Sequence, residues 1–485
     1  MNLWPGRGSI SEVGQGEVWD SKRLESEVRK RVSLLRKLGI GHDSRVLCCH
    51  GGTPAFFADL FAIWRLGGCA VCLAPNLTAA ELSNIVDFLS PSLLLTDESF
   101  SGGAGSGTPI VCAKNEVERY CDTEQFSPVG ELDSPALILL TSGTTGIPKS
   151  VVLSFRALLA RLTLNRLHIS DDALANTLCV MPTHFGHGLI GNCLTPLYAG
   201  KHLILAPITD AKKAADLGSV IDAYDVTFMS SVPTIWKIVL KVGKRPGDES
   251  LRQVSVGSAP LSKELWQDII DWVGTNNVVN MYGVTEAANW IAGAASSLLA
   301  PEDGLIGTMW GGSAGVLDDE GQLHNEGEGE LVLQTPALMA GYYGQPDVTA
   351  EVLRGGWFRT GDIGRINTDG VMRLIGRKKS EINRAGIKVQ PEELDSLLER
   401  HPEVIEACTF GMPDEISGET VAAAIQLAPE SNLNSESLRG WALERIRREN
   451  VPERWFFLDE IPKSERGKIN RQTIMIQCMK VAQDQ

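Results

Sequence analysis

The sequence has no excess of positive charge. Its 485 residues include 45 Lys and Arg against 60 Asp and Glu, which gives a formal net charge of -15 at pH 7. A protein that binds nucleic acid through the phosphate backbone needs a basic surface, so we expect no nucleic-acid partner. With 43% hydrophobic and 22% charged residues, the composition is typical of a globular chain that is long enough to bury more than one core.

Long apolar runs are also missing. The uncharged stretch 183–200 is interrupted by His, Asn, Pro and Gly. The start of the chain, MNLWPGRGSISEVGQGEVWD, has acidic residues but no apolar segment of the kind found in signal peptides. We therefore expect a cytoplasmic protein without a membrane span.

The ten cysteines lack the spacing of a disulfide framework. Cys69 and Cys72 form a CxxC pair, but they lie in the apolar run CAVCLAP, and no second pair or neighbouring His completes a zinc site. A chain of this length does not need disulfides to be stable. We interpret the cysteines as reduced thiols and this pair as buried strand residues.

From Arg45 onward, short apolar runs alternate with helix-length segments. The runs RVLCCH, CAVCLAP and PSLLLTD predict strands, and TPAFFADLFAIWRLG and TAAELSNIVDFL predict helices. Thr78 and Glu81 have the spacing of a capping box at the start of the second helix. The residues of this helix expected to face the sheet are Leu82, Ile85, Val86 and Leu89. This βαβαβ order predicts a parallel sheet covered on both faces, with ligands at the carboxyl ends of its strands.

The composition changes near Gly376, from apolar and Gly-rich to charged. Beyond it, PEELDSLLERH and SLRGWALERIRRE predict helices, and VIEACTFGM and ETVAAAIQLA predict strands. This is a small α+β unit of about 105 residues, which is the usual scale of one domain. The predicted fold class is α/β, with a large N-terminal domain of several subdomains and doubly wound sheets over residues 1–376. The small α+β domain covers residues 377–485.

The segment TSGTTGIPKS, residues 141–150, follows the predicted strand ALILL. Gly143 and Gly146 allow backbone N–H groups to turn inward, the hydroxyls can donate to phosphate oxygens, and Lys149 adds a positive charge. The segment does not fit the Walker A pattern, because two residues separate Gly146 from Lys149. On composition alone, a phosphate-binding loop and a surface turn are equally open.

The segment resembles the phosphate loop of the adenylate-forming superfamily, which includes acyl-CoA synthetases, aryl-CoA ligases and the adenylation domains of peptide synthetases. Further matches follow in the family's order: GSAPL at 257–261, MYGVTE at 281–286, GWFRTGD at 356–362, GRKK at 376–379 and PKSERGKINR at 462–471. The resemblance covers nearly the whole chain. It implies an ATP-dependent ligase that activates a carboxylic acid as acyl-AMP, releases pyrophosphate and transfers the acyl group to a thiol.

The resemblance implies which residues bind the nucleotide. The matching positions are Thr141, Ser142, Gly143, Thr144, Thr145, Gly146, Lys149, Ser258, Ala259, Pro260, Tyr282, Gly283, Asp362 and Arg377. Among them, Ser258, Ala259 and Pro260 would line the adenine pocket. Tyr282 would stack on the base, a role that suits an aromatic ring. Asp362 would accept from the ribose hydroxyls.

The resemblance also implies the catalytic groups. Thr285 would contact the α-phosphate, and Glu286 would hold Mg²⁺, a hard cation that prefers oxygen ligands. Lys468 would be the adenylation lysine, because an anionic carboxylate must approach an anionic phosphate and the transition state needs positive charge. Family members rotate the small domain between the two half-reactions. Lys379 matches the hinge, and Gly386 matches the glycine that lets a loop approach the thiol tunnel.

The segment that matches the family's acid pocket is MPTHFGHGLIG, residues 181–191. It has no Asp or Glu to pair with a substrate ammonium, so we expect an acid that is not an α-amino acid. His184 and His187 are its notable polar residues, and the resemblance places His187 near the acyl carboxyl. A core histidine satisfied by the backbone is the alternative. An apolar pocket would be lined by Phe185, Trp236, Met281, Trp290 and Trp310, although aromatic residues are more often plain core.

The acceptor thiol is less well defined. The loop INRAGIKV has Asn383 and Ala385 where CoA-using aryl ligases commonly carry lysines, and Arg384 and Lys388 are approximate substitutes. We expect CoA, with the phosphopantetheine of an acyl carrier protein as the alternative acceptor and partner. A phosphate-loop NTPase, a non-catalytic scaffold and a luciferase-like oxygenase on the same fold are further alternatives.

Overall fold

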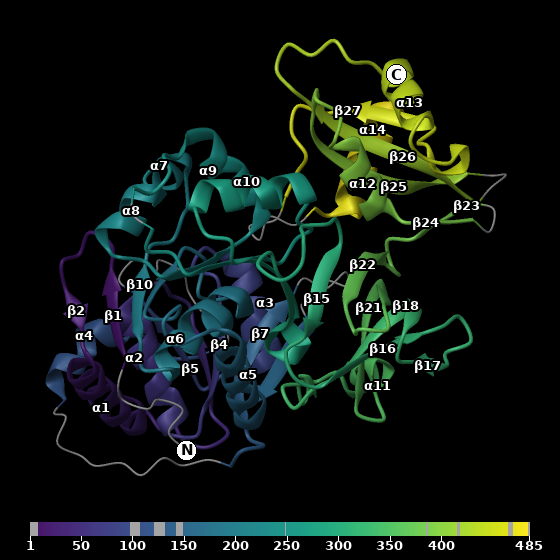
Figure 1. Cartoon of the computed structure of the whole chain (residues 1–485). Helices are drawn as coiled ribbons and strands as arrows, with labels where there is room; N and C mark the ends of the chain where they lie inside the picture. Colours follow the sequence, from purple (N-terminus) through teal and green to yellow (C-terminus); the bar gives the residue numbers. More distant parts are fainter. Residues whose placement is uncertain are drawn as a thin grey trace.

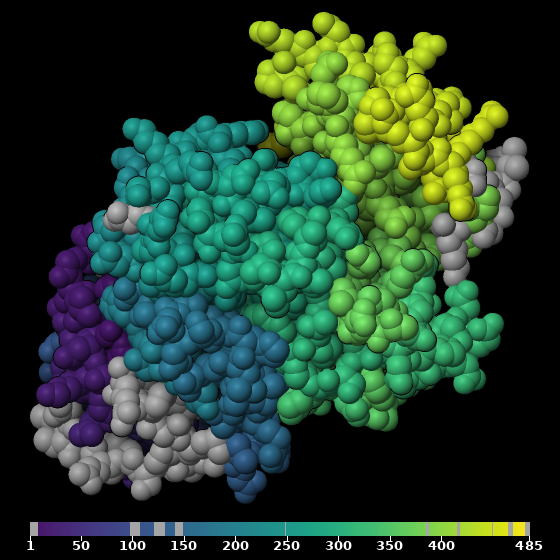
Figure 2. Space-filling view, viewed as in Figure 1, coloured from purple at the N-terminus to yellow at the C-terminus, as the bar shows by residue number. Residues whose placement is uncertain are grey.

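The computed structural model describes residues 8–97, 107–120, 131–141, 149–247, 249–384, 387–414, 418–463 and 469–483. Two sheets form the N-terminal part of the chain, and a third sheet forms a separate C-terminal lobe (Figure 1). In Figure 2 this lobe, coloured light green to yellow, rests on the teal segment of the N-terminal part.

The first sheet contains the predicted βαβαβ segment. In spatial order its strands are β19 (Gly341–Tyr342), β8 (Lys149–Ser154), β7 (Pro135–Thr141), β4 (Cys69–Cys72), β3 (Arg45–Cys48), β5 (Leu93–Thr96) and β6 (Ile110–Cys112). The strands from β7 to β6 are parallel. The helices α2 (Pro54–Arg65) and α3 (Ala79–Leu89) connect β3, β4 and β5, as predicted.

Helix α3 begins with the predicted capping box. The Thr78 hydroxyl accepts from the Glu81 N–H, and the Glu81 carboxylate accepts from the Thr78 N–H. The four apolar residues expected to face the sheet, Leu82, Ile85, Val86 and Leu89, are all buried. Periodicity and capping therefore predicted this helix and its buried face correctly.

Strands β7 and β8 form an antiparallel hairpin. Thr141 at the end of β7 pairs with Lys149 at the start of β8, and Leu140 pairs with Ser150. Segment 142–148, the centre of the expected phosphate loop, connects these two strands and lies outside the described residues. The described ends of the expected phosphate loop, Thr141 and Lys149, are thus paired in one antiparallel ladder.

The second sheet has fifteen strands and joins a parallel half to an antiparallel half. In spatial order they are β17 (Leu323–His324), β16 (Ser313–Leu317), β18 (Gly327–Gln334), β21 (Trp357–Ile366) with β20 (Leu353–Arg354) beside it, β22 (Met372–Arg377), β15 (Leu305–Met309), β14 (Asn289–Ala295), β13 (Val278–Val284), β12 (Gln253–Gly257), β11 (Phe228–Ser231), β9 (Asn176–Cys179), β10 (His202–Leu205), β1 (Ser9–Glu12) and β2 (Val18–Trp19). Strands β1, β10, β9, β11, β12 and β13 are parallel, and β14 begins the antiparallel half.

The remaining helices cover these sheets. They are α1 (Ser21–Lys37), α4 (Ala113–Glu116), η1 (Val117–Arg119), α5 (Phe155–His168), the π-helix η2 (His187–Leu194), α6 (Thr195–Tyr198), α7 (Ala211–Ala215), α8 (Leu217–Ala223), α9 (Pro233–Val242), α10 (Lys263–Val273), η3 (Thr285–Ala287) and α11 (Pro346–Val352). Helix α2 contacts β3 and β4 of the first sheet and β1 of the second, so it lies between the sheets. This position explains why α2 is buried on nearly all sides, with Ala55 and Arg65 as its only residues outside the core.

The C-terminal lobe has its own sheet and cores. Its sheet contains β24 (Ile387–Val389), β23 (Ile382–Arg384), β26 (Gly418–Leu427), β25 (Val404–Asp414) and β27 (Arg454–Phe457), and its helices are α12 (Pro391–Leu398), α13 (Ser435–Leu443), the short η4 (Arg448–Asn450) and α14 (Arg471–Gln483). The expected helix SLRGWALERIRRE ends earlier than predicted, at Leu443. The lobe contacts the N-terminal part through ion pairs from Glu399 to Lys237, at 3.2 Å, and from Arg400 to Asp303.

Cys69 and Cys72 are buried in β4, as predicted, and burial raises the pKa of the Cys69 thiol to about 12. The nine cysteines in the described part of the chain are free thiols. Within the described ranges, no helix is both long and apolar enough to cross a membrane.

Candidate active site

The carboxyl ends of three parallel strands bring the predicted motifs together. In the register of the sheet, β11 pairs with β12, and Gly257 at the end of β12 pairs with Met281 in β13. GSAPL therefore begins beside MYGVTE, and Ser230 lies near the end of the neighbouring β11. This is the edge at which parallel sheets bind their ligands.

His187 connects two of these strands. It is 5% exposed at the start of η2, and hydrogen bonds join its Nδ1 to the Ser258 hydroxyl at 2.8 Å and its Nε2 to the Ser230 hydroxyl at 2.6 Å. Its ring partners are therefore side chains at the strand ends, which argues against the alternative of a core histidine satisfied by the backbone. Ser258, expected at the adenine pocket, holds this bond from a left-handed backbone with φ of 69°.

Aromatic side chains close the space behind His187. Trp290 lies edge-on to the imidazole at a centroid distance of 5.5 Å, and it also contacts Phe228 and Trp310. Met281 belongs to the same buried cluster. Trp236, another pocket candidate, instead packs on Trp272 between α9 and α10 and is plain core.

A second group consists of Tyr282, Asp362 and Arg377. The Tyr282 hydroxyl donates to Asp362 Oδ2 at 2.5 Å, and Arg377 Nε lies 2.8 Å from Asp362 Oδ1. The pairing of β21 with β22 places Asp362 opposite Arg377. Burial, followed by the charge of Asp362, raises the pKa of Tyr282 well above its ordinary value. The phenol therefore stays protonated and holds the carboxylate in one orientation.

Tyr342 connects Glu286 with Lys149. Its hydroxyl donates to Glu286 Oε1 at 2.7 Å, and the Lys149 ammonium lies 4.6 Å from the centre of its ring. Burial and the Glu286 charge raise the pKa of Tyr342. Tyr342 was not predicted as a site residue, because only the pairing of β19 with β8 brings it to this place.

The structure also describes several of the other predicted residues. Thr285 begins η3, and Gly283 lies against the Asn289 carbonyl. After the end of β12, Ala259 is half-buried and Pro260 is exposed, and Lys379 is exposed in the turn after β22. The backbone of Thr141 ends β7. Ser142, Gly143, Thr144, Thr145, Gly146, Ala385, Gly386 and Lys468 lie outside the described residues.

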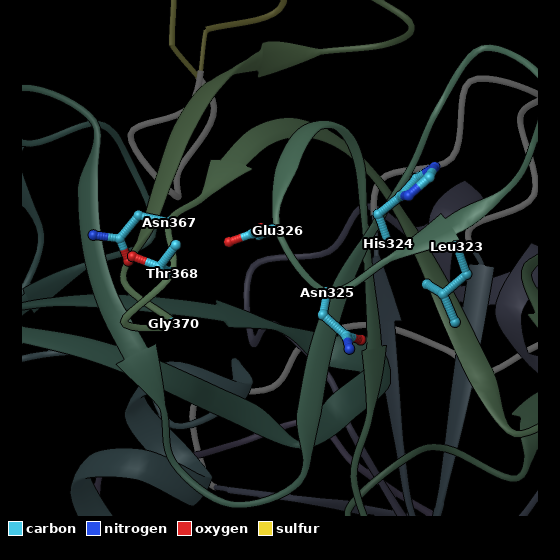
Figure 3. A pocket seen from close by; sticks show the side chains of 7 residues that line it. All are labelled: Leu323, His324, Asn325, Glu326, Asn367, Thr368 and Gly370. Atoms are coloured by element: carbon cyan, nitrogen blue, oxygen red, sulfur yellow. The ribbon is translucent and has the colours of Figure 1, made fainter.

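A pocket of about 640 Å³ lies elsewhere, between β17 and the turn after β21. Figure 3 shows Glu326 pointing toward the turn that carries Asn367 and Thr368, whereas His324 points away from it. His324 is paired with Asp318 at 2.7 Å. None of the predicted site residues that the structure describes lines this pocket, so we assign it no part in the chemistry.

The fold and the ordered motifs at the strand ends define a class of protein: an adenylate-forming ligase that joins an acid to a thiol. The chain belongs to the AMP-binding enzyme family. The family model described as "AMP-binding enzyme" matches residues 5–343, and the model of the "AMP-binding enzyme C-terminal domain" matches residues 393–468.

Similar proteins of known name are ligases. The chain is 28% identical to an oxalate–CoA ligase of Arabidopsis thaliana, over 97% of this chain and 95% of that protein. It is 33% identical to a sulfoacetate–CoA ligase of Cupriavidus necator, over 71% and 67% of the two chains. It is 28% identical to the fatty acid–[acyl-carrier-protein] ligase ScoC of Streptomyces coeruleorubidus, over 95% and 92%.

Solved structures share the fold. ATP-bound MatB from Rhodopseudomonas palustris superposes with a TM-score of 0.88 at 23% identity, over 97% of this chain and 96% of that chain. The o-succinylbenzoate CoA synthetase MenE from Bacillus subtilis, in complex with AMP, gives 0.86 at 21% identity, over 97% and 96%. These comparisons confirm the predicted fold class, the family and the enzyme class.

Proposed function

We propose that the protein activates a short carboxylic acid without an α-amino group as its acyl-adenylate and then transfers the acyl group to CoA. The observation that carries this proposal is His187, held between Ser230 and Ser258 at the strand ends. An imidazole held between two hydroxyls suits a carboxylate, because the serine that accepts from the ring N–H can donate its own O–H to the acid in a defined orientation.

The aromatic cluster supports a short acid. Trp290 and Trp310 are 1% and 5% exposed and pack against each other, and Trp290 also packs against His187, so side chains fill the space on this side of the imidazole. Among similar proteins, an oxalate–CoA ligase, a sulfoacetate–CoA ligase and a malonate–CoA ligase carry names with short acids.

The nucleotide would lie between the two groups described above. Asp362 would accept from the ribose, since Tyr282 and Arg377 already fix its orientation, and the Tyr282 ring would stack on the base. Lys149 and segment 142–148 would hold the phosphates, and Thr285 would contact the α-phosphate.

The Glu286 carboxylate and its neighbour Tyr342 suit the binding of a magnesium ion. Its carboxylate is held by one neutral donor, Tyr342, and carries no ion pair in the described part of the chain, so its charge is available for a cation. Bound there, Mg²⁺ would neutralise charge on the phosphates. Glu286 and Tyr342 would keep the position and orientation of this carboxylate.

Lys468 would supply positive charge for the first half-reaction, and a rotation of the C-terminal lobe at Lys379 would remove it before the thiol enters. Gly386 would let its loop approach the thiol. These assignments rest on the family resemblance.

CoA remains the proposed acceptor, with a phosphopantetheine-loaded carrier protein as the second candidate. The observation that favours the second candidate is Arg384, whose guanidinium pairs with Glu453 of the C-terminal lobe, so that its charge is partly neutralised before any phosphate approaches. The two acceptors are distinguished by measuring the rate of acyl transfer at increasing concentrations of CoA, of free pantetheine and of the loaded carrier protein. If pantetheine equals CoA in kcat/KM, the CoA nucleotide is not recognised and the carrier protein becomes the acceptor.

The test of the reaction is a panel of acids with ATP, measured by the products. The proposal requires acid-dependent release of pyrophosphate and AMP. Release of orthophosphate and ADP would instead establish the phosphate-loop NTPase.

A further inference from the structure

Asn289, at the start of β14, has a buried hydrogen-bond donor that is not used. The residue is 8% exposed, and its Nδ2 has no hydrogen-bond partner among the residues that the structure describes. Its backbone φ is 89°, and that of Ala288 before it is 55°, so two successive residues occupy the left-handed region. Buried donors without partners and strained backbones both lower stability, and they are retained mainly at functional sites.

The Asn289 amide adjoins the segment that carries His187. A Cβ on Gly191 would lie 2.4 Å from Asn289 Nδ2, and a Cβ on Gly186 would lie 3.8 Å from Asn289 Cβ. Gly186 and Gly191 flank His187 on the same short segment, and Trp290, the residue after Asn289, packs edge-on against the His187 ring. The amide and the imidazole therefore lie beside the same segment, 186–191, and the missing side chain of Gly191 is what lets the Asn289 amide lie directly against it.

A buried positive charge stands behind this position. Arg161 in α5 is fully buried, and it donates to the carbonyls of Ala287 at 3.3 Å and Trp310 at 3.4 Å, while its Nη2 has no hydrogen-bond partner among the residues that the structure describes. Over the described ranges of the chain, no carboxylate forms an ion pair with it. Burial lowers its pKa to about 9, so it keeps its charge at neutral pH. The segment from Ala287 to Asn289 thus lies in the field of a cation that has no counter-ion in the described part of the chain.

We propose that Asn289, with Arg161 behind it, recognises a second oxyanion at the far end of a short acid substrate, such as a second carboxylate or a sulfonate. The inference rests on the proposed function, because it takes the reacting carboxyl to lie at His187. The amide donates to the second oxyanion, and the guanidinium field makes an anion more favourable there than a neutral group. The acid must be short, because the Asn289 amide and the His187 imidazole both lie at one segment, 186–191.

The experiment compares acids of equal length with the wild-type protein. Malonate carries a second carboxylate, malonamate replaces it by a neutral amide, and propionate replaces it by a methyl group. The expected result is a kcat/KM for pyrophosphate release that is higher for malonate than for either analogue by about tenfold or more, which is the range of a hydrogen bond to a charged group. The same comparison of kcat/KM between oxalate and glyoxylate tests a shorter acid. The comparison between sulfoacetate and propionate tests a sulfonate as the second oxyanion.

Two variants test the residue itself. Asn289→Asp keeps the shape but places a negative charge at the amide, so it should lower kcat/KM for the dianionic acid by about tenfold or more and leave propionate within about threefold. Asn289→Gly removes the side chain and suits the positive φ, so it should lower the preference for the dianion while the protein stays folded, as measured by thermal unfolding. Isothermal titration of each acid, without turnover, gives the same ranking in binding.

The outcomes distinguish a failure of the proposed function from a failure of the second-oxyanion site. If no acid yields pyrophosphate and AMP with the wild-type protein, the proposed function fails. If the wild-type protein forms adenylates but prefers the neutral or methyl analogues, or if Asn289→Asp lowers kcat/KM equally for all acids, the second-oxyanion site is refuted while the proposed function stands.

Discussion

Substitution of Tyr282 by Phe removes one hydroxyl and keeps the ring. The hydroxyl donates to Asp362 at 2.5 Å, and both side chains are buried, at 6% and 3% exposure. A hydrogen bond to a charged acceptor contributes roughly 1.5–3 kcal/mol to stability, so we expect Tyr282→Phe to lower the free energy of unfolding by that amount. Since the aromatic face remains, the variant should keep most of its affinity for the adenine base and lose mainly the orientation of Asp362.

The assay is a double-mutant cycle with Asp362→Asn, in which urea unfolding gives stability and ATP-dependent pyrophosphate release gives function. Arg377 lies 2.8 Å from the same carboxylate and stays in place in every variant, so the cycle isolates the bond from the phenol. We expect a coupling free energy of about 1 kcal/mol or more in unfolding. Coupling near zero would refute the claim that the phenol and the carboxylate act as one unit.

Three further predictions concern the domains and pH. Lys468→Ala should abolish most adenylate formation but spare thioester formation from supplied acyl-adenylate; equal loss in both half-reactions would contradict the role of this lysine. Lys379→Pro should spare adenylation and impair thioester formation, since a fixed φ restricts a hinge, and unchanged acyl transfer would place the hinge elsewhere. Burial lowers the pKa of His168 and His202 below 6.5, so the unfolded chain binds more protons than the folded one as the pH falls. The free energy of unfolding should therefore be highest above pH 6.5 and decrease below it. In urea unfolding at pH 7.5 and 5.5, the His202→Gln variant should lose less of this free energy than the wild-type protein. An identical loss in both proteins would exclude His202 as a source.

The sequence predicted what depends on neighbours along the chain. Thr78 and Glu81 are three residues apart, so their capping box and the buried face of α3 could be read from spacing. The antiparallel half of the second sheet was not predicted, because its pairs depend on distant register: Gly327 pairs with Ile366, and Gly293 pairs with Thr308. Local periodicity carries no information about such partners.

The same limit applies to the site. Ordered motifs indicated His187, Glu286 and Asp362, but the partners that fix them come from elsewhere in the chain. Tyr342 and Glu286, which form a hydrogen bond, are 56 positions apart in the sequence, and His187 and Ser258 are 71 positions apart. Asn289 could not be singled out, because its importance depends on its burial and on the absence of a hydrogen-bond partner within the described ranges, and the sequence shows neither.

The β7–β8 hairpin makes the length of segment 142–148 as important as its composition. Lys149 pairs with Thr141 and begins a strand whose other edge pairs with the strand of Tyr342. Loss of one residue from the connection would either break these two ladders or move β8 by one position, which turns every side chain of the strand to the opposite face. Lys149 would then leave the Tyr342 ring, and Val151 and Leu153 would exchange faces with Val152. Selection on this loop therefore acts on the number of residues, and natural variation at this place should consist of substitutions rather than insertions or deletions.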